Sequence, residues 1–423
     1  MIFITDKYNC CGCTACAALC PKQCIAMHED EKGFLYPHVD TSKCIDCKLC
    51  EMACPVINQA EPRKPLKVFA AKNTNEKVRL KSSSGGIFSM IAERIINNGG
   101  VVFGARFNEQ WEVVHDFTDT IEGLETFRGS KYVQSRIGNN FKKTELFLKN
   151  GREVLFTGTP CQIAGLQRFL RKDYPNLLTI DVICHGVPSP LVWRDYLKHI
   201  LCPRDRIRKN TVSLSLNEIP NLSGISFRDK MAGWKKYSFI IRTKSVFRSD
   251  RNSVLPSKDN ILCHDVLQQN VFLRGFLQNL YLRSSCYKCP SRNFKSNSDF
   301  LLGDFWNIDS INREINDDKG VSLVFALSFK ALSFIKEMEG FIPIAEHFFT
   351  PIYNSNKNIF VDEIESSNSK IFWKEYLEDK MELTKCIKKN THYSKMQKLK
   401  DNIFLHLINF HLDYLIMLWR KRK

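Results

Sequence analysis

The sequence predicts a small α+β module built from two cysteine-rich halves, followed by an α/β domain with an antiparallel insertion and a helical tail. Three observations support this prediction. A four-cysteine spacing occurs twice within the first 55 residues. From residue 66 onward, short apolar runs alternate with helical patterns, as in an α/β core. Between residues 206 and 260 the segments become strand-like and alternating, which favours antiparallel pairing.

The two cysteine runs share the spacing C-x2-C-x2-C-x3-C, and proline follows each run. This doubled run is typical of bacterial two-cluster ferredoxins. In these, three close thiolates bind one 4Fe–4S cluster, and the fourth cysteine binds the other cluster. The first cluster is therefore expected on Cys10, Cys13, Cys16 and Cys54. The second is expected on Cys44, Cys47, Cys50 and Cys20.

Zinc sites and disulfides are the competing interpretations of these cysteines. Zinc usually takes two C-x2-C pairs, so a third, evenly spaced cysteine argues against it. The first residues lack a basic segment followed by an apolar run, which indicates a reducing cytoplasm and not a disulfide scaffold. Cys11 and Cys24 fall outside the spacing and are expected to be free thiols. Two clusters this close together indicate a protein that moves electrons.

A polar, proline-bearing linker at 58–65 separates the ferredoxin module, residues 1–57, from a larger domain, residues 66–350. Within that domain one helical face is formed by Ile87, Phe88, Ile91 and Ile95. Further helices are expected at 162–171 and 190–200. Strands are expected at 68–72, 101–107, 153–160, 177–186, 298–306 and 321–327.

The last segment, residues 351–423, is lysine-rich and predicted to be a partly helical tail. Its end, residues 402–423, carries one narrow polar stripe and is too short and too polar for a membrane span. Peripheral contact with the inner face of a membrane and packing against protein stay open as alternatives. The net charge of +17 is dispersed and no nucleic-acid motif accompanies it. An acidic redox partner or an anionic membrane surface is therefore the favoured partner, and nucleic acid is not.

Two polar turns of the larger domain are candidate phosphate or flavin contacts. Ser82–Gly86 stand before a predicted helix, where hydroxyls and exposed N–H groups form a natural pyrophosphate cradle. The alternative is a simple helix cap. Gly129–Tyr132 offer a flexible turn, a cation and an aromatic ring, although any surface turn has the same composition.

Four more cysteines are distant in the sequence. Cys161 and Cys184 follow two core strands, so they are expected at one edge of the sheet if those strands are neighbours. Cys286 and Cys289 form a C-x2-C pair. Spacing leaves three interpretations open: a third 4Fe–4S cluster, a structural zinc site, and a nucleophilic Cys161 at a helix N-terminus.

Other single residues carry weaker signals. His185 is a candidate proton donor beside a flavin or substrate, with a structural hydrogen-bonded histidine as the alternative. Asp304 is a candidate to orient a ligand or to cap a turn. Cysteines without ligand spacing are expected to be structural or free: Cys202, Cys263 and Cys386.

A collinear set of motifs resembles the coenzyme F420 hydrogenase/dehydrogenase beta-subunit family over about residues 5–330. The motifs are SSSGGIF, VVFGA, RGSKYVQS, VLFTGTPCQIAGL, DVICHGVPSP, FRDKMAGW, RSSCYKC, GDFW and DDKGVSLV. Proteins of this family bind FAD and 4Fe–4S clusters, and they pass electrons between a reduced deazaflavin, the flavin and the clusters. Similar bacterial proteins with an N-terminal ferredoxin module occur in surface-polysaccharide gene clusters.

The resemblance implies FAD contacts at Ser83, Ser84, Gly85, Gly86, Ser130, Lys131 and Tyr132. It also implies a third 4Fe–4S cluster, rather than zinc, on Cys161, Cys184, Cys286 and Cys289. Two features depart from the family pattern. Asn307 stands where glycine commonly follows GDFW, and the lysine-rich tail has no counterpart in the archaeal hydrogenase subunits. With the fused module, that tail places the chain in the bacterial branch.

The sequence as a whole predicts a cytoplasmic iron–sulfur flavoprotein oxidoreductase. Hydride exchange is expected at FAD, and single electrons are expected to pass between the flavin and the clusters. The hydride donor or acceptor is a deazaflavin such as coenzyme F420 or another small molecule, and a protein such as ferredoxin is the redox partner. Two alternatives stay open: a ferredoxin-fed reductase of an organic substrate in surface-polysaccharide biosynthesis, and a non-catalytic electron-transfer subunit.

Overall fold

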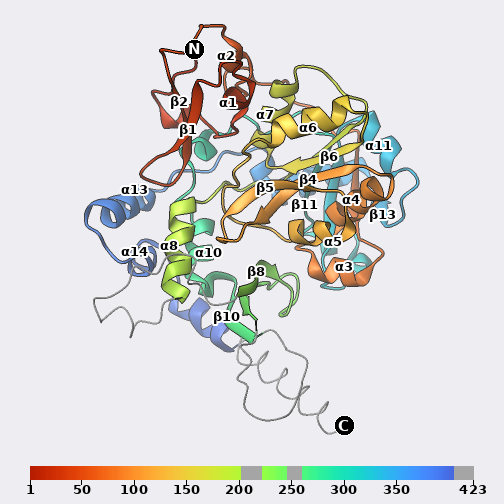
Figure 1. Cartoon of the computed structure of the whole chain (residues 1–423). Helices are drawn as coiled ribbons and strands as arrows, with labels where there is room; N and C mark the ends of the chain where they lie inside the picture. Colours follow the sequence, from red (N-terminus) through yellow and green to blue (C-terminus); the bar gives the residue numbers. More distant parts are fainter. Residues whose placement is uncertain (202–221, 245–259, 404–423) are drawn as a thin grey trace, which may run out of the picture. The chain divides into compact units, whose positions relative to one another are not determined.

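A computed structural model describes residues 1–201, 222–244 and 260–403 (Figure 1). The chain divides into two compact units. The first unit combines Met1–Arg194 with Leu282–Glu365, and the second combines Asp195–Tyr281 with the chain from Ser366 onward. Each unit is described separately below.

The first unit begins with a small module of two short helices and one hairpin, drawn in red in Figure 1. The strands are β1 (Ile25–Glu29) and β2 (Leu35–Val39), which pair antiparallel with Ile25 opposite Val39. The helices are α1 (Ala15–Leu19) and α2 (Leu49–Met52), and each begins just after the second cysteine of its run. The duplicated sequence therefore folds into duplicated loop–helix segments around one hairpin.

The core of the first unit is an eight-stranded mixed sheet with the order β13-β3-β12-β11-β7-β6-β4-β5. Strands β4, β6, β7 and β11 pair in parallel, and the remaining neighbours pair antiparallel. The bounds are β3 Lys67–Ala71, β4 Val101–Phe107, β5 Val113–Thr118, β6 Val154–Gly158, β7 Leu177–Val182, β11 Phe300–Asp304, β12 Ser322–Ala326 and β13 Phe341–Pro343. The predicted α/β core is therefore confirmed as a mixed sheet.

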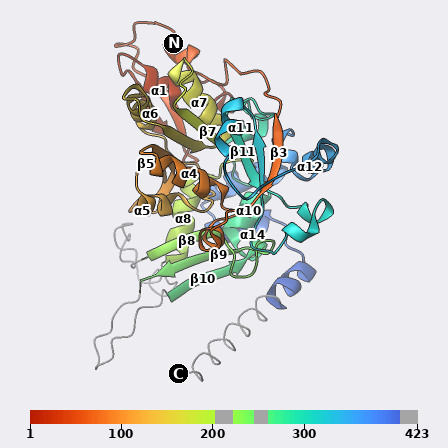
Figure 2. The ribbon, with the colours of Figure 1, turned by 90° about the vertical axis from the view of Figure 1, so that its right-hand side faces the viewer.

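Helices cover both faces of this sheet (Figure 2). One face packs against α4 (Ile87–Asn97) and α11 (Phe329–Ile335), and α4 buries the predicted apolar stripe. The other face packs against α6 (Asn140–Lys149) and α7 (Pro160–Leu170). Alternate residues of β6 separate the two cores, because Leu155 belongs to the first and Val154 and Phe156 belong to the second.

The N-terminal module shares the second of these cores. Cys11, Cys13 and Ala15 pack with apolar residues of α6 and α7, and Ala15 is wholly buried. Gly165 in α7 permits this contact, because a Cβ atom there would lie 2.8 Å from the Cβ of Cys13. The module and the sheet are therefore one packed body.

The second unit contains a three-stranded antiparallel sheet with the order β10-β9-β8. Its strands are β8 Leu222–Asp229, β9 Ser238–Thr243 and β10 Asn260–Val266. The predicted antiparallel insertion is confirmed for these strands. Residues 202–221 and 245–259, and with them Cys202, lie outside the described residues. Rings of Tyr196, Phe227, Phe239, Phe272 and Tyr281 pack together beside the sheet.

The described part of the predicted tail is helical. Its helices are α12 Phe349–Ser355, α13 Ser367–Trp373 and α14 Leu383–Asn390. Further helices are α3 Glu76–Lys81, α5 Ile121–Leu124, α8 Pro190–Leu201 and α10 Val271–Leu277. Residues 404–423, which include nearly all of the predicted amphipathic end, lie outside the described residues. Among the helices of the described chain, none has the length and apolar content needed to cross a bilayer.

Candidate metal centres

The two cysteine loops of the module have the same backbone conformation. Gly12 and Asp46, which precede the second cysteine of each run, have φ angles of 69° and 48°. Thr14 and Lys48, which follow it, have φ angles of 65° and 62°. Left-handed residues on both sides of a cysteine curl the backbone around it, and three non-glycine residues accept this uncommon conformation. The repetition indicates that both loops are shaped to enclose the same kind of group.

The first cysteine group is Cys10, Cys13, Cys16 and Cys54, and all four side chains are buried. Burial and, after it, the neighbouring thiols of Cys10 and Cys54 raise the pKa of Cys16 to about 12. These thiols need a cationic partner before they ionise, which an iron–sulfur cluster supplies. Within the described chain the buried Oγ1 of Thr14, next to Cys13, has no hydrogen-bond partner. The residues of this group fit a 4Fe–4S cluster.

The second cysteine group is Cys20, Cys44, Cys47 and Cys50. All four line one cavity of about 350 Å³, and Cys47 is exposed to solvent. The N–H of Ile2 donates to the Sγ of Cys50 at 3.2 Å. Cys24 lines the same cavity, with its Sγ 3.4 Å from that of Cys20. A thiol-lined cavity of this kind fits a second cluster, and Cys24 is an extra thiol beside it.

The third cysteine group is Cys161, Cys184, Cys286 and Cys289. Strands β6 and β7 are parallel neighbours, so Cys161 and Cys184 emerge at one edge of the sheet, as predicted. Burial and, after it, the neighbouring thiols of Cys289 and Cys161 raise the pKa of Cys286 to about 12. The structure therefore brings these distant cysteines together.

A buried hydroxyl completes this third group. In the part of the chain that is described, the Oγ of Ser291 has no hydrogen-bond partner, and Ser291 follows Cys289 by two residues. This matches the position of Thr14 beside the first group. Also among the described residues, no three His, Cys, Asp or Glu side chains converge on a point where a single metal ion would sit. The donor set fits a cluster that is wrapped by four thiolates.

Cys11 lies between the first and third groups. Its thiol is beside the thiols of Cys13 and Cys161. The contact with Cys13 and burial hold the pKa of Cys11 well above the ordinary value, although the contact with Cys161 lowers it. The Cys161 pKa is raised in turn, first by Cys11 and then by burial. Sequence spacing gives Cys11 no role, and only the fold places it between two candidate cluster sites.

Arg283 and Gln134 join the loops of these two sites. The Arg283 side chain is fully buried and donates to the Cys10 carbonyl at 2.8 Å, the Leu35 carbonyl at 2.9 Å and the Gln134 Oε1 at 3.0 Å. The Gln134 amide donates to the Cys11 carbonyl at 3.1 Å. The Arg283 carbonyl accepts from the N–H of Cys286 at 2.9 Å. Sequence reasoning missed both residues, although Arg283 stands within the RSSCYKC motif.

The two turns predicted to contact FAD lie side by side, because the N–H of Ser130 donates to the Oγ of Ser83 at 2.7 Å. Other groups in these turns are engaged within the protein. The Ser84 hydroxyl donates to the Val321 carbonyl, and the Gly85 N–H donates to the Ser322 Oγ. The Lys131 ammonium donates to three carbonyls of its own turn, those of Phe127, Arg128 and Gly129. Gly86 caps α4, and a flavin phosphate placed here would have to replace some of these contacts.

His185, the candidate proton donor, lies beside acidic and amide groups rather than in an open cleft. Its Nδ1 is 3.2 Å from the Oε1 of Glu363 and 3.2 Å from the Nδ2 of Asn358. Asp304 ends strand β11. Cys263 contacts the Asp265 carboxylate, and Cys386 is buried against the Phe372 carbonyl.

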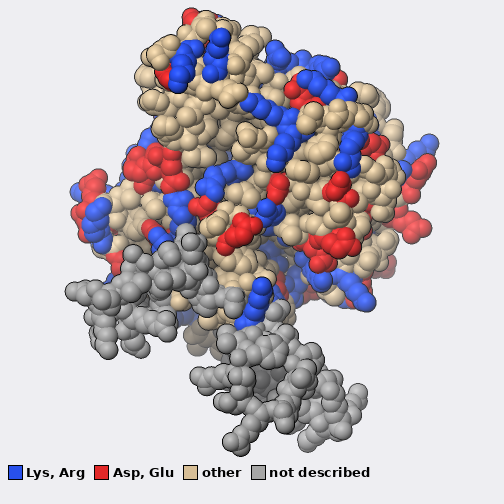
Figure 3. All heavy atoms as spheres, viewed as in Figure 1, with Lys and Arg blue, Asp and Glu red and all other residues tan. Residues whose placement is uncertain are grey.

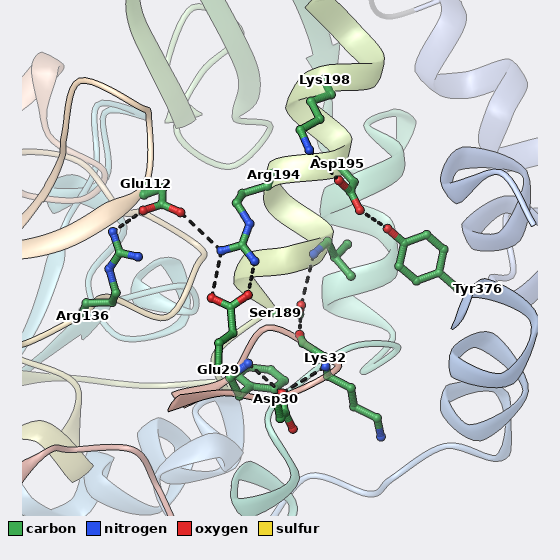
Figure 4. A network of polar contacts seen from close by, with 12 residues as sticks. Glu29, Asp30, Lys32, Glu112, Arg136, Ser189, Arg194, Asp195, Lys198 and Tyr376 are labelled. Atoms are coloured by element: carbon green, nitrogen blue, oxygen red, sulfur yellow. Dashed lines mark hydrogen bonds and ion pairs between the residues drawn. The ribbon is translucent and has the colours of Figure 1, made fainter. Parts of the chain in front are cut away.

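A cavity of about 500 Å³ lies against the loop of the first cysteine group. Gly12 and Thr14 form one side of it. Its other side carries a chain of ion pairs, in which Arg194 binds Glu29 and Glu112, and Arg136 binds Glu112 (Figure 4). In the second unit, Asp195 accepts from Tyr376 and pairs with Lys198. No sequence pattern indicated the cavity or its ion pairs.

Comparison with known proteins identifies both parts of the chain. Residues 151–345 match the family model of the coenzyme F420 hydrogenase/dehydrogenase beta subunit, C terminus. Residues 9–58 match the model of the 4Fe–4S dicluster domain. An uncharacterized ferredoxin of Methanocaldococcus jannaschii is 35% identical over 65 residues, which are 14% of this chain and 83% of the ferredoxin.

Two further proteins are also similar. The coenzyme F420-dependent sulfite reductase of Methanocaldococcus jannaschii is 25% identical over 204 residues, 47% of this chain. The match spans only 31% of the length of that reductase. A chain of the F420-reducing [NiFe] hydrogenase complex from Methanosarcina barkeri matches with 14% identity and a TM-score of 0.42, covering 70% of this chain and 90% of that one.

Proposed function

Residues 151–345 match the family model of the coenzyme F420 hydrogenase/dehydrogenase beta subunit, C terminus, and residues 9–58 match the 4Fe–4S dicluster domain; from this premise we propose an iron–sulfur oxidoreductase with three clusters in series. The electron path runs from the second cysteine group through the first to the third. The chain would act on a small hydride donor or acceptor at one end of the path and on a redox partner protein at the other.

The arrangement of the three cysteine groups within one unit carries this proposal. Cys47 of the second group is exposed, whereas every cysteine of the first group is buried in the module. The first group in turn packs on α7, whose first turn holds Cys161 of the third group. Such an order conducts single electrons between the surface of the module and the edge of the sheet.

A flavin provides the step between single electrons and hydride. We place FAD at Ser83–Gly86 and Ser130–Tyr132, where the Ser83–Ser130 hydrogen bond holds the two turns together. When bound, FAD can accept a hydride and release its electrons singly. The first turn of α4 offers backbone N–H groups to a phosphate. Burial lowers the pKa of Lys131 to about 7, and a phosphate nearby would favour its charged form.

The surface around the second cysteine group favours a protein as the partner at that end. Three apolar side chains of the module are exposed there: Phe3 (79%), Ile45 (59%) and Met52 (56%). Elsewhere on the face shown in Figure 3, Lys and Arg lie interspersed with Asp and Glu. Exposed apolar side chains on the module that holds an exposed cluster ligand suit the short contact that a ferredoxin-sized donor or acceptor makes.

The cavity beside the first cysteine group favours a second candidate function, a reductase of an organic substrate fed by ferredoxin. Its ion pairs offer both carboxylate and guanidinium groups to a polar substrate. In this alternative the substrate is a component of surface-polysaccharide biosynthesis. The non-catalytic electron-transfer subunit is the version in which a partner supplies all of the hydride chemistry.

Iron and flavin content per chain after anaerobic purification tests the proposal. About twelve irons and one FAD are expected, four irons for each cluster. Cys289→Ser should remove about four irons, whereas Cys263→Ser, at a cysteine outside the three groups, should remove none. Eight irons together with zinc would show that the third cysteine group is a structural zinc site. Eight irons without flavin would exclude hydride transfer by the chain itself.

A screen of donors separates the candidate functions. Bleaching of the flavin by reduced coenzyme F420 or by a nicotinamide, followed by cluster reduction, supports a complete oxidoreductase. Reduction by ferredoxin alone, with reoxidation on addition of a sugar-linked substrate, supports the reductase. A chain that exchanges electrons with ferredoxin and with no small molecule is an electron-transfer subunit.

A further inference from the structure

Arg283 carries a buried charge beside the first cysteine group. Its guanidinium has no exposed surface, and Nη2 is 3.6 Å from the Sγ of Cys10. Its other hydrogen bonds go to neutral acceptors, the carbonyls of Cys10 and Leu35 and the amide of Gln134. In the described chain no carboxylate pairs with it. A buried charge without a carboxylate is costly unless another anion compensates it.

Aromatic rings complete the surroundings of this charge. The guanidinium carbon is 4.3 Å from the centre of the Tyr36 ring and 5.4 Å from that of Phe34. A π-face attracts a cation without neutralising it. The thiolate of Cys10 is therefore the nearest anionic partner available to Arg283. The rest of the negative charge that offsets the guanidinium must come from the cluster that Cys10 would hold.

The surroundings of the second cysteine group are different. Lys22 and Lys43 are exposed beside it, and Lys43 pairs with Asp40. The N-terminal ammonium and Lys48 are also exposed there. Asp46 pairs with both, and Glu51 pairs with the N-terminus at 2.6 Å. Paired and solvated charges have little net effect on a nearby site. A buried guanidinium without a carboxylate partner has a strong effect on a nearby cluster, because the low dielectric of the interior screens its charge weakly.

We propose that Arg283 is a redox-determining residue: its charge holds the reduction potential of the first cluster above that of the second. The inference rests on the proposed function, since it needs clusters in both groups. Reduction adds one negative charge to a cluster, and a neighbouring cation stabilises that reduced state. One electron then leaves the second cluster, which is oxidised, and enters the first, which is reduced, and no proton moves.

Arg283 also joins the loops of the first and third cysteine groups. A purely structural role therefore has to be separated from its electrostatic effect on the first cluster. Gln134 provides the means, because its Oε1 accepts from Arg283 at 3.0 Å. Gln134→Glu keeps the shape of the side chain and places a carboxylate against the guanidinium. Gln134→Leu removes the same hydrogen bond without changing any charge. Arg283→Gln removes the charge itself.

The experiment is a redox titration of the anaerobic full-length protein, followed by electron paramagnetic resonance. Cys47→Ser, at the exposed cysteine of the second group, identifies which signal belongs to the second cluster. In Arg283→Gln and in Gln134→Glu, the reduced-to-oxidised ratio of the first cluster at a fixed potential should fall at least tenfold, which is 59 mV for one electron. Gln134→Leu and the exposed-charge control Lys48→Gln should leave it within twofold.

The outcomes are distinct. If Arg283→Gln fails to retain iron, the comparison of Gln134→Glu with Gln134→Leu decides the question. Equal shifts in these two variants, or no shift in either, would overturn the inference while the clusters and the proposed function remain. Fewer than eight irons in the wild-type chain would remove both the proposed function and the inference.

Discussion

A Cβ atom on Gly165 would lie 2.9 Å from the Sγ of Cys13, so the backbone of α7 passes directly against a thiol of the first cysteine group. This glycine sits mid-helix, where it costs stability relative to alanine. Its cost is explained by the close approach of the module, since any side chain would push the Cys13 loop away.

Gly165→Ala tests that contact. The added methyl group should displace the Cys13 loop and destabilise the protein by about 1–3 kcal/mol, the usual cost of overpacking. It should also lower the iron content by about one cluster, measured per chain after anaerobic purification. Gly224→Ala is the matched control, because a Cβ atom there would meet nothing within 4 Å. Equal iron in Gly165→Ala and the wild type would show that the module does not depend on this approach.

Cys24 should act as a reserve ligand of the second cluster. Its Sγ is 3.4 Å from that of Cys20, and both line the same cavity. Cys20→Ser alone should therefore keep nearly all of its iron, whereas Cys20→Ser with Cys24→Ser should lose about four irons. Cys24→Ser alone should lose none. Loss of the second cluster in Cys20→Ser alone would show that Cys24 does not replace Cys20 as a ligand.

The stability of the protein should depend on the protonation of Asp181. This side chain is buried at the end of β7, where the Ser298 hydroxyl donates to it at 2.9 Å, and burial raises its pKa to about 7. The folded chain keeps this proton between pH 4 and 7 while the unfolded chain releases it, so the contribution is favourable at low pH and is lost as the pH rises through 7.

Asp181→Asn removes that titration. Relative to the wild type, the variant should gain about 2–3 kcal/mol of unfolding free energy between pH 5 and pH 8. Thermal unfolding of the anaerobic proteins at pH 5, 6.5 and 8 measures the difference. Glu109→Gln, at an exposed turn, is the control. Parallel pH profiles of Asp181→Asn and the wild type would show that Asp181 does not titrate in this range.

The flavin turns can be tested through the hydrogen bond between them. Ser83→Ala removes the acceptor of the Ser130 N–H and should lower the FAD content per chain several-fold, with iron unchanged. Ser82→Ala is the matched control, because the Ser82 hydroxyl donates to the Val78 carbonyl of its own helix. If both variants keep their flavin, FAD is bound elsewhere or not at all.

The sequence was most informative where function depends on local spacing. The doubled cysteine run predicts two cluster loops, and Gly12, Thr14, Asp46 and Lys48 share one backbone pattern in the structure. The edge shared by Cys161 and Cys184 was also predictable, because side chains that follow neighbouring parallel strands emerge together.

Contacts between distant segments could not be predicted in this way. Arg283 lies 273 residues from Cys10 in the sequence, and no periodicity connects them. In the sequence, Gly165 is an ordinary position of a predicted helix, and only the fold shows that Cys13 packs against it. The edge strands β5 and β13 were likewise missed, since short strands beside a sheet leave only a weak signal.

The unequal burial of the two cysteine groups in the module predicts unequal exchange of their clusters. The first group is covered on one side by α7, so we expect iron and sulfide to reach it most easily before the module packs on that helix. The second group opens to solvent at Cys47, so we expect its cluster to be damaged by oxygen and rebuilt more readily in the folded protein.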